Sequence, residues 1–232
     1  MGKVKTLGRP TRPLISRERA ARAALSVIDI HGIEAFSLEL VARKMGVKAP
    51  SLYYHFNDKA ELLAEAARLI LVDVELPEEQ PDDWESSQVA VAVAARRSIL
   101  QHPNAAPLLL QFFPRRLLLA AYDRRYSTCP YPEDQLLIVI EGAEKLTFGS
   151  ALFEASSRSR GVDPMPNFDP EKLPTLAKAI RSNRLNDEEL FIETLRRFFA
   201  SFRMTDTPTA PAKTTKSRAR KTADKVESGE AD

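Results

Sequence analysis

The sequence predicts an all-α protein with a small N-terminal group of helices and a larger C-terminal group. Apolar residues recur three and four positions apart in most of the segments between residues 16 and 202, which is the spacing of one face of an α-helix. Capping residues such as Ser, Asp and Asn precede several of these segments, and glycine or proline ends them. At 232 residues, the chain can hold one large helical domain or a small domain followed by a larger one.

The composition is that of a globular protein and excludes several classes. Residues are 44% hydrophobic and 28% charged, and no apolar run approaches the ~20 residues of a membrane span. The first residues lack the apolar region of a secretory signal peptide. The single cysteine, Cys129, excludes an intramolecular disulfide framework and a cysteine-based zinc site. We therefore expect a cytoplasmic protein with no membrane partner.

Basic charge is concentrated near the N-terminus, although the net charge is only +2. Residues 1–59 contain 11 Lys and Arg against 5 Asp and Glu, whereas residues 60–205 contain 17 against 22. Positive charge gathered in one part of a chain is typical of a protein that binds a polyanion. The N-terminal part is therefore the expected nucleic-acid-binding part.

The chain should begin with a flexible basic arm followed by a helix. Residues 1–15 have few apolar residues and are interrupted by glycine and proline. Arg9 of this arm could lie in a narrow minor groove, or the arm could be a solvated tail attracted to any DNA; both interpretations stay open. A helix is expected over residues 16–31, ended by Gly32. Its apolar stripe is Ala20, Ala24, Val27 and Ile28.

Residues 37–59 predict two short helices joined by a tight turn. Ser37 is the expected N-cap of the first, over residues 38–44. Gly46 stands where the end of that helix needs a left-handed residue, a conformation that glycine adopts without steric cost. The second helix has Pro50 in its first turn, where the missing N–H costs nothing. Two helices joined in this way form a helix-turn-helix.

The second helix of this motif has more aromatic residues than a core could accept. Leu52 and Phe56 are four positions apart and are expected to face inward. Tyr53, Tyr54 and His55 are consecutive, so they span most of the helix circumference and cannot all be buried. Their hydroxyl and imidazole groups suit phosphates and base edges. The pattern favours a recognition helix over a helical hairpin whose aromatic residues are all core.

These residues resemble the TetR family of transcriptional repressors. The family pattern is an A-x-x-x-G-V turn followed by a recognition helix close to [PG]-[ST]-L-Y-x-H-F-x-x-K-x-x-L. The matching residues are Ala42, Gly46, Val47, Pro50, Ser51, Leu52, Tyr53, His55, Phe56, Lys59 and Leu62. The match covers residues 1–70, and the rest of the chain resembles the family only in being helical.

The resemblance implies a homodimeric DNA-binding regulator, a repressor that a small-molecule effector releases from a near-palindromic operator. The DNA contacts that it implies are Ser37, Lys48, Ala49, Pro50, Ser51, Tyr53, Tyr54, His55 and Lys59, with Arg9 of the arm. One position departs from the pattern: many members have a basic or polar residue just inside the first helix, where this chain has Glu39. A carboxylate there could accept from a cytosine amino group, and a guanine contact becomes doubtful.

The remaining chain predicts one more N-terminal helix, a boundary and a C-terminal helical domain. Asp58 and Glu61 form a D-x-x-E capping box for a helix that continues to about Val74. The acidic, proline-broken residues 75–83 separate a DNA-binding domain (16–74) from an effector-binding and dimerisation domain (84–203). The C-terminal helices are expected over residues 84–101, 104–113, 114–126, 133–158, 174–183 and 187–202. Residues 204–232 have the composition of a disordered basic tail, which could attract DNA non-specifically or simply be solvated.

The helix over residues 133–158 is apolar on more than one side, which predicts burial in two directions. Small residues on one face allow helices to approach closely, so this face could form a dimer interface or an internal contact. In the TetR family the two corresponding helices of each subunit form a four-helix dimer bundle. The expected interface is Gly142, Leu146, Gly149 and Phe153, with Leu195 and Phe198 of the last helix.

The implied effector pocket can be assigned only to aromatic and histidine residues of the C-terminal domain, most of which could equally be core. They are Trp84, His102, Phe112, Phe113, Tyr122, Phe148 and Phe153. The three histidines have no metal-site spacing, and no nucleotide-binding loop or nucleophile elbow is present, so neither a cofactor nor an enzyme is expected. The alternative function is an architectural protein that binds any DNA through its arm and tail without an effector.

Overall fold

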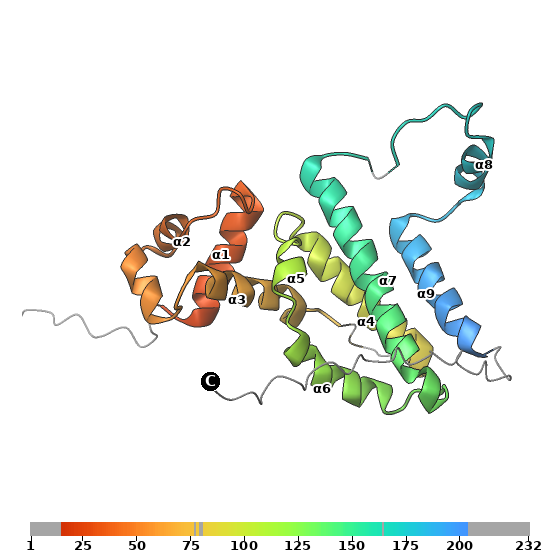
Figure 1. Ribbon diagram of the computed structural model, residues 1–232, viewed down its shortest axis with the longest axis horizontal. Coiled ribbons are helices and arrows are strands. Elements are labelled where there is room, and N and C mark those ends of the chain that lie inside the picture. The colour runs from red at the N-terminus through yellow and green to blue at the C-terminus, as the bar shows by residue number, and fades with distance from the viewer. Residues whose placement is uncertain (1–14, 77, 79–80, 164, 204–232) are drawn as a thin grey trace, which may run out of the picture.

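The structure is a computed structural model that describes residues 15–76, 78, 81–163 and 165–203; these residues form helices and no strand, which confirms the all-α class (Figure 1). The N-terminal helices are α1 (Arg17–His31), α2 (Leu38–Met45), the 3-10 helix η1 (Ala49–Tyr54) and α3 (Lys59–Val72). The C-terminal helices are α4 (Trp84–Gln101), α5 (Leu108–Gln111), α6 (Arg115–Tyr126), α7 (Glu133–Arg160), α8 (Pro174–Ser182) and α9 (Asp187–Arg203). Arg9 and the predicted tail lie outside the described residues. None of the helices described could cross a membrane.

Capping contacts fix the helix ends of the N-terminal part as predicted. The Ser37 hydroxyl accepts from the backbone N–H three residues later at 3.2 Å, and Gly46 ends α2 with a left-handed φ of 70°. Asp58 accepts from the backbone N–H of Glu61 at 2.7 Å. The Glu61 carboxylate in turn accepts from the backbone N–H of Asn57, not of Asp58, at 2.7 Å. Each contact satisfies a backbone donor that the first turn of a helix leaves unpaired.

The second helix of the motif differs from the prediction because it is a short 3-10 helix. The Lys48 carbonyl accepts from Ser51 at 2.9 Å and the Leu52 carbonyl accepts from His55 at 2.9 Å, both three residues apart. Pro50 has no N–H to give, and 3-10 helices are used in short pieces, so η1 ends at Tyr54. Phe56 therefore lies beyond the helix, yet it is buried with Leu52 as expected.

One cluster of buried apolar side chains extends from the N-terminal helices into the C-terminal ones. It contains the predicted stripe of α1 and, across residues 75–83, Ile99 of α4, Leu108 of α5 and Ala151 of α7. Polar contacts follow the same path. The Ser98 hydroxyl donates to the Ile70 carbonyl of α3 at 2.5 Å, and His102 Nδ1 lies 2.8 Å from Asp29 of α1. The helices on the two sides of the linker therefore share a core.

The C-terminal helices are organised around α4, which packs along α7 and contacts α9. In Figure 1, α8 stands beyond α9, away from this bundle. Trp84, the first residue of α4, meets Tyr126, Tyr131 and Phe199 edge-on with ring centroids 5.4–5.7 Å apart. A buried ion pair between Arg96 of α4 and Glu154 ties α4 to α7.

Two C-terminal predictions are corrected by the structure. The helix expected over residues 104–113 is reduced to α5, because the His102 carbonyl accepts from both Ala105 and Ala106 at 2.9 Å and so makes tight turns first. The second correction concerns how far α7 is buried. It packs on α4 through a stripe that includes Val139, Ala143 and Ala151, and it also contacts α9. Leu137, Ile138 and Phe153 nevertheless remain 68%, 59% and 83% exposed.

Candidate nucleic-acid interface and interior pocket

Tyr53 and Tyr54 are the exposed aromatic residues of η1, the predicted recognition helix, at 57% and 89% exposure. Leu52 before them and Phe56 after them are buried in the core, so the backbone holds both tyrosine rings out toward solvent. Of the other predicted contacts, Lys48, Pro50 and Lys59 are exposed, while Ser37, Ala49, Ser51 and His55 are partly buried. Tyrosine rings combine apolar surface with a hydroxyl, which suits them to a wet, polar partner.

Arg17, at the start of α1, holds the end of the recognition helix in place. Its guanidinium lies 4.5 Å from the centroid of the Phe56 ring and donates to the His55 carbonyl. It also pairs with Glu61 of α3 at 2.8 Å. The hydrogen bond from the Asn57 backbone, followed by that from Arg17, holds the pKa of Glu61 below its usual range. A single side chain thus links three helices beneath the exposed tyrosines.

The first turns of α2 and α3 meet near Phe36. The Lys59 ammonium donates to the Phe36 carbonyl at 3.0 Å and lies 5.1 Å from the centroid of its ring. An ammonium has three N–H donors, so Lys59 can still bind a phosphate. The Ser37 hydroxyl uses an acceptor site to cap α2, which leaves its O–H able to donate. Two helix N-termini with these side chains suit an anionic phosphate.

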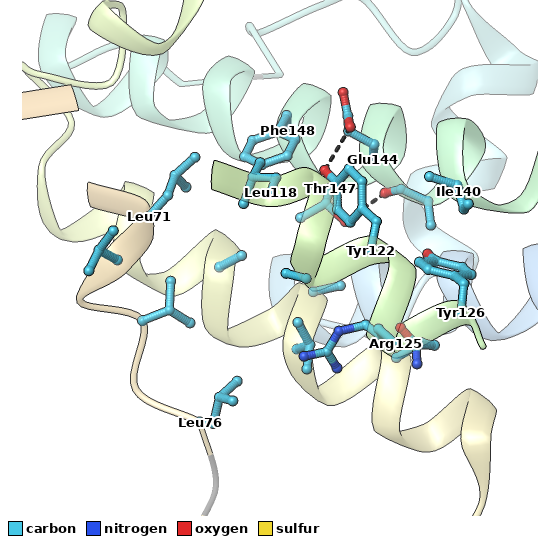
Figure 2. A pocket seen from close by; sticks show the side chains of 18 of the residues that line it. Leu71, Leu76, Leu118, Tyr122, Arg125, Tyr126, Ile140, Glu144, Thr147 and Phe148 are labelled. Carbon is cyan, nitrogen blue, oxygen red and sulfur yellow. Dashed lines mark hydrogen bonds between the residues drawn. The ribbon is translucent and has the colours of Figure 1, made fainter. Parts of the chain in front are cut away.

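A cavity of about 310 Å³ lies between α4, α6 and α7 and reaches the end of α3 (Figure 2). Each of the three helices contributes a set of four residues at the spacing i, i+3, i+4 and i+7, to which α6 adds Tyr126 and α7 adds Phe148; each set includes a polar side chain. The sets are Gln88, Val91, Ala92 and Ala95 of α4; Leu118, Ala121, Tyr122 and Arg125 of α6; and Ile140, Ala143, Glu144 and Thr147 of α7. The remaining lining residues are Leu71, Val72, Val74, Leu76, Tyr126, Phe148 and Phe199.

The polar groups of the cavity differ in how they are paired. Glu144 accepts from the Tyr122 hydroxyl at 2.7 Å and from Arg115 at 3.0 Å, and burial raises the pKa of Tyr122. Burial raises the pKa of Tyr126 to about 12, so its hydroxyl stays neutral. Burial also lowers the pKa of Arg125, although a guanidinium remains charged at any ordinary pH.

The residues predicted for an effector pocket divide between this cavity and other parts of the fold. Tyr122 and Phe148 line the cavity; Trp84 packs behind it on Tyr126 and Phe199. The other four predicted residues are elsewhere: His102 binds Asp29, Phe112 and Phe113 pack against the core that joins the two parts, and Phe153 is exposed. Sequence reasoning missed Gln88, Arg125, Glu144 and Thr147 because it followed aromatic residues. The available signal was a polar residue inside an otherwise apolar helical face.

The predicted dimer residues divide into two groups. Leu195 is fully buried in its own chain, and a Cβ on Gly142 would collide with the Phe198 ring of α9. Leu146 and Phe198 pack against the buried cluster that contains Leu195, so these residues make contacts inside one chain. The assignment of Leu195 to a dimer interface is therefore wrong. Gly149 and Phe153 are different. A Cβ on Gly149 would meet nothing within 4 Å, and both residues border a groove of about 860 Å³ between α7 and α9.

We expect Gly142→Ala to destabilise the fold, because the added methyl displaces the Phe198 ring in a packed cluster. Overpacking of this kind costs about 1–3 kcal/mol, of which the higher helix propensity of alanine offsets about 1 kcal/mol. The free energy of unfolding in urea is the measurement, with exposed Lys145→Ala one turn away as the control. Phe198→Leu should recover part of the loss when combined with Gly142→Ala. A gain in stability of about 1 kcal/mol, which is the helix-propensity difference alone, would contradict the close contact.

The comparisons with known proteins agree with one another. The family described as bacterial regulatory proteins, tetR family, matches residues 21–66. The HTH-type transcriptional repressor DrrR1 of Streptomyces coeruleorubidus is 32% identical over 195 residues, which is 76% of this chain and 69% of that protein. An HTH-type transcriptional regulator of Saccharopolyspora erythraea is 32% identical over 98 residues, 42% of this chain and only 42% of that relative's length. The Streptomyces coelicolor TetR family protein ActR, in a crystal structure with (S)-DNPA, shares the fold at 20% identity and a TM-score of 0.63, over 82% of this chain and 98% of that one.

Proposed function

Because this chain belongs to the TetR family of bacterial DNA-binding transcriptional regulators, we propose that it is a homodimeric repressor that a small-molecule effector releases from a near-palindromic operator in the cytoplasm. The observation that carries this proposal is the exposure of Tyr53 and Tyr54 on a recognition helix that Arg17 and a buried core hold from below. A recognition helix that is held in place before it meets DNA loses little conformational entropy on binding.

On the DNA, the recognition helix would enter the major groove. Lys48, Ser51, Tyr53, Tyr54 and His55 would contact base edges or nearby phosphates. Ser37 and Lys59, at the N-termini of α2 and α3, would hold one phosphate of the backbone and so fix the register. Glu39 is exposed in the first turn of α2, where it would accept from a cytosine amino group.

The dimer would form through the outer sides of α7 and α9. Ile138, Gly149 and Phe153 are 11 and 4 positions apart, which puts them on one side of α7. Leu190 of α9, 47% exposed, borders the same groove as Gly149 and Phe153. A second copy related by a two-fold axis would cover this apolar surface and set two recognition helices about one DNA turn apart, roughly 34 Å.

The cavity supports control by an effector because its wall includes the end of α3. Leu71 and Val72 belong to the last turn of that helix, and α3 packs along α1 in the DNA-binding part. A ligand that fills the cavity would press on the helix that positions the recognition segment. Effector and operator would then weaken each other's binding by the same factor.

Selection of bound sequences from random DNA tests the proposal. We expect a near-palindromic consensus, and a metabolite screen against that operator should yield compounds that release the protein. Equal affinity for all sequences, with a steep dependence on salt, would instead indicate the architectural alternative. The two outcomes are separated by measuring how the affinity depends on salt concentration, for the selected DNA and for a scrambled sequence.

A further inference from the structure

We propose that the effector is an amphipathic anion whose apolar body fills the cavity and whose anionic group binds the Arg125 guanidinium beside the Gln88 amide. The inference rests on the effector-released function proposed above and adds the chemical class of the ligand. A carboxylate or another group of similar charge is the natural partner, because guanidinium binds two oxygens of one group in parallel.

Arg125 is the partly buried arginine that has no acidic partner among the described residues. Three arginines among the residues described are not exposed: Arg68, Arg96 and Arg125. Arg68 pairs with Glu65 at 2.6 Å, and Arg96 pairs with Glu154. No carboxylate of the described residues pairs with Arg125, and its side chain makes no hydrogen bond to them. A charge withdrawn from water without a partner is unfavourable, so an anion brought by a ligand would be strongly held.

Gln88 and Tyr126 add further polar groups on the same cavity whose side chains no described residue hydrogen-bonds. The Gln88 residue is only 6% exposed, and no hydrogen bond joins its side-chain amide to another described residue. The Tyr126 hydroxyl also lines the cavity without such a bond. The polar atoms of neither side chain are sealed from solvent, so both are open to a ligand that enters the cavity. Together with the guanidinium they supply mostly donors, which favours an acceptor such as a carboxylate.

The cavity has its apolar end opposite Arg125. Figure 2 shows Leu71 and Phe148 on one side of the cavity and Arg125 and Tyr126 on the other. Gln88 and Arg125 also line an adjoining cleft of about 570 Å³, so the anionic group would lie where the cavity meets this more polar cleft. The volume of the cavity itself, about 310 Å³, is near the lower end of known ligand pockets. It therefore favours a ligand whose apolar body is one or two rings or a short acyl chain.

Acidic residues near the site do not cancel the charge of Arg125. Glu144, inside the cavity, is already bound by Tyr122 and Arg115. Asp82 and Asp83 line the adjoining cleft; Asp83 caps α4 by accepting from the Ser86 backbone at 2.8 Å, and neither carboxylate forms an ion pair with Arg125. If these carboxylates nevertheless dominated the site, a cationic ligand would bind best, and the experiment includes that case.

Three probes with one apolar body test the inference: 2-naphthylacetate, its primary amide and 2-(2-naphthyl)ethylamine. Each is titrated calorimetrically into the full chain at neutral pH and fixed salt. We expect the acid to bind at least about 10-fold more tightly than the amide or the amine, since hydrogen bonds between a carboxylate and a guanidinium are stronger than those of a neutral amide. Arg125→Met should bring acid and amide within about twofold. Arg116→Met, an exposed arginine of α6 outside the cavity, should keep the preference.

Equal binding of acid and amide, tighter binding of the amine, a preference that survives Arg125→Met, or no binding of any probe would each overturn the inference. Thermal unfolding checks the variant: loss of an unpaired charge should leave the midpoint unchanged or higher, so that lost binding is not lost folding. Operator binding is measured separately, without probes. A chain that binds its operator but does not prefer the acid refutes this inference alone, whereas a chain without an operator refutes the proposed function.

Discussion

Tyr53→Ala is expected to abolish operator binding and to leave the fold intact. The ring is more than half exposed and lies outside the core, so its removal should barely change the free energy of unfolding. On DNA, each half-site would lose a base or phosphate contact that contributes about 1–3 kcal/mol. A dimer loses this contact twice, so the operator affinity should fall by about 2–6 kcal/mol, measured at one fixed salt concentration.

Tyr53→Phe is the matched control for the role of the hydroxyl. If the hydroxyl makes the contact, Tyr53→Phe should bind as poorly as Tyr53→Ala, and if the ring packs on DNA it should retain most of the affinity. Affinity of Tyr53→Ala within twofold of the unmodified chain would show that the ring does not enter the groove. A large fall in its thermal midpoint would show instead that Tyr53 belongs to the fold.

Phe153→Asp is expected to convert the dimer to a folded monomer that no longer binds its operator. The side chain is 83% exposed in one chain, so the substitution removes almost nothing from the protomer's own packing. In the proposed dimer, the two-fold axis would bring an unpaired carboxylate into the interface twice, where desolvation makes it strongly unfavourable. Sedimentation at micromolar concentration measures the association, and circular dichroism confirms that the helices persist.

Leu119→Asp provides the corresponding control, because Leu119 is an exposed apolar residue of α6, outside α7 and α9. This variant should remain dimeric. If Leu119→Asp dissociates the dimer and Phe153→Asp does not, the interface lies elsewhere. A Phe153→Asp chain that unfolds would show that the ring packs within the protomer.

The DNA-binding part could be predicted closely because its determinants are local in sequence. Ser37, Gly46 and Asp58 each act on the backbone within a few residues, and their capping roles are those that the sequence predicts. The 3-10 form of η1 was missed because helical spacing describes side-chain direction, which is similar over one or two turns in both kinds of helix. Leu52 and Phe56 are therefore buried and Tyr53 and Tyr54 exposed as expected, whereas Ser51 and His55 are partly buried and the helix type differs.

The cavity could not be predicted because it depends on how three helices sit against each other. Gln88, Arg125 and Glu144 are 37 and 19 positions apart and look like ordinary surface residues of separate amphipathic helices. Aromatic residues such as Phe113 were assigned to the pocket but pack in the core, since a large ring can be buried in either place. The α7–α9 contact was ambiguous for the same reason: Gly142 and Gly149 look alike in sequence, and only packing distinguishes the occupied face from the open one.

The core that passes from α1 and α3 into α4, α5 and α7 bears on how such proteins can be recombined. Residues 15–72 would not be an interchangeable module, since Ile99, Leu108 and Ala151 complete their core. A chimera that joined them to another regulator's sensing helices would expose apolar surface at the seam. Functional recombinants should therefore carry matching residues at these three positions, and directed evolution of new sensor–operator pairs should accumulate its compensating changes there.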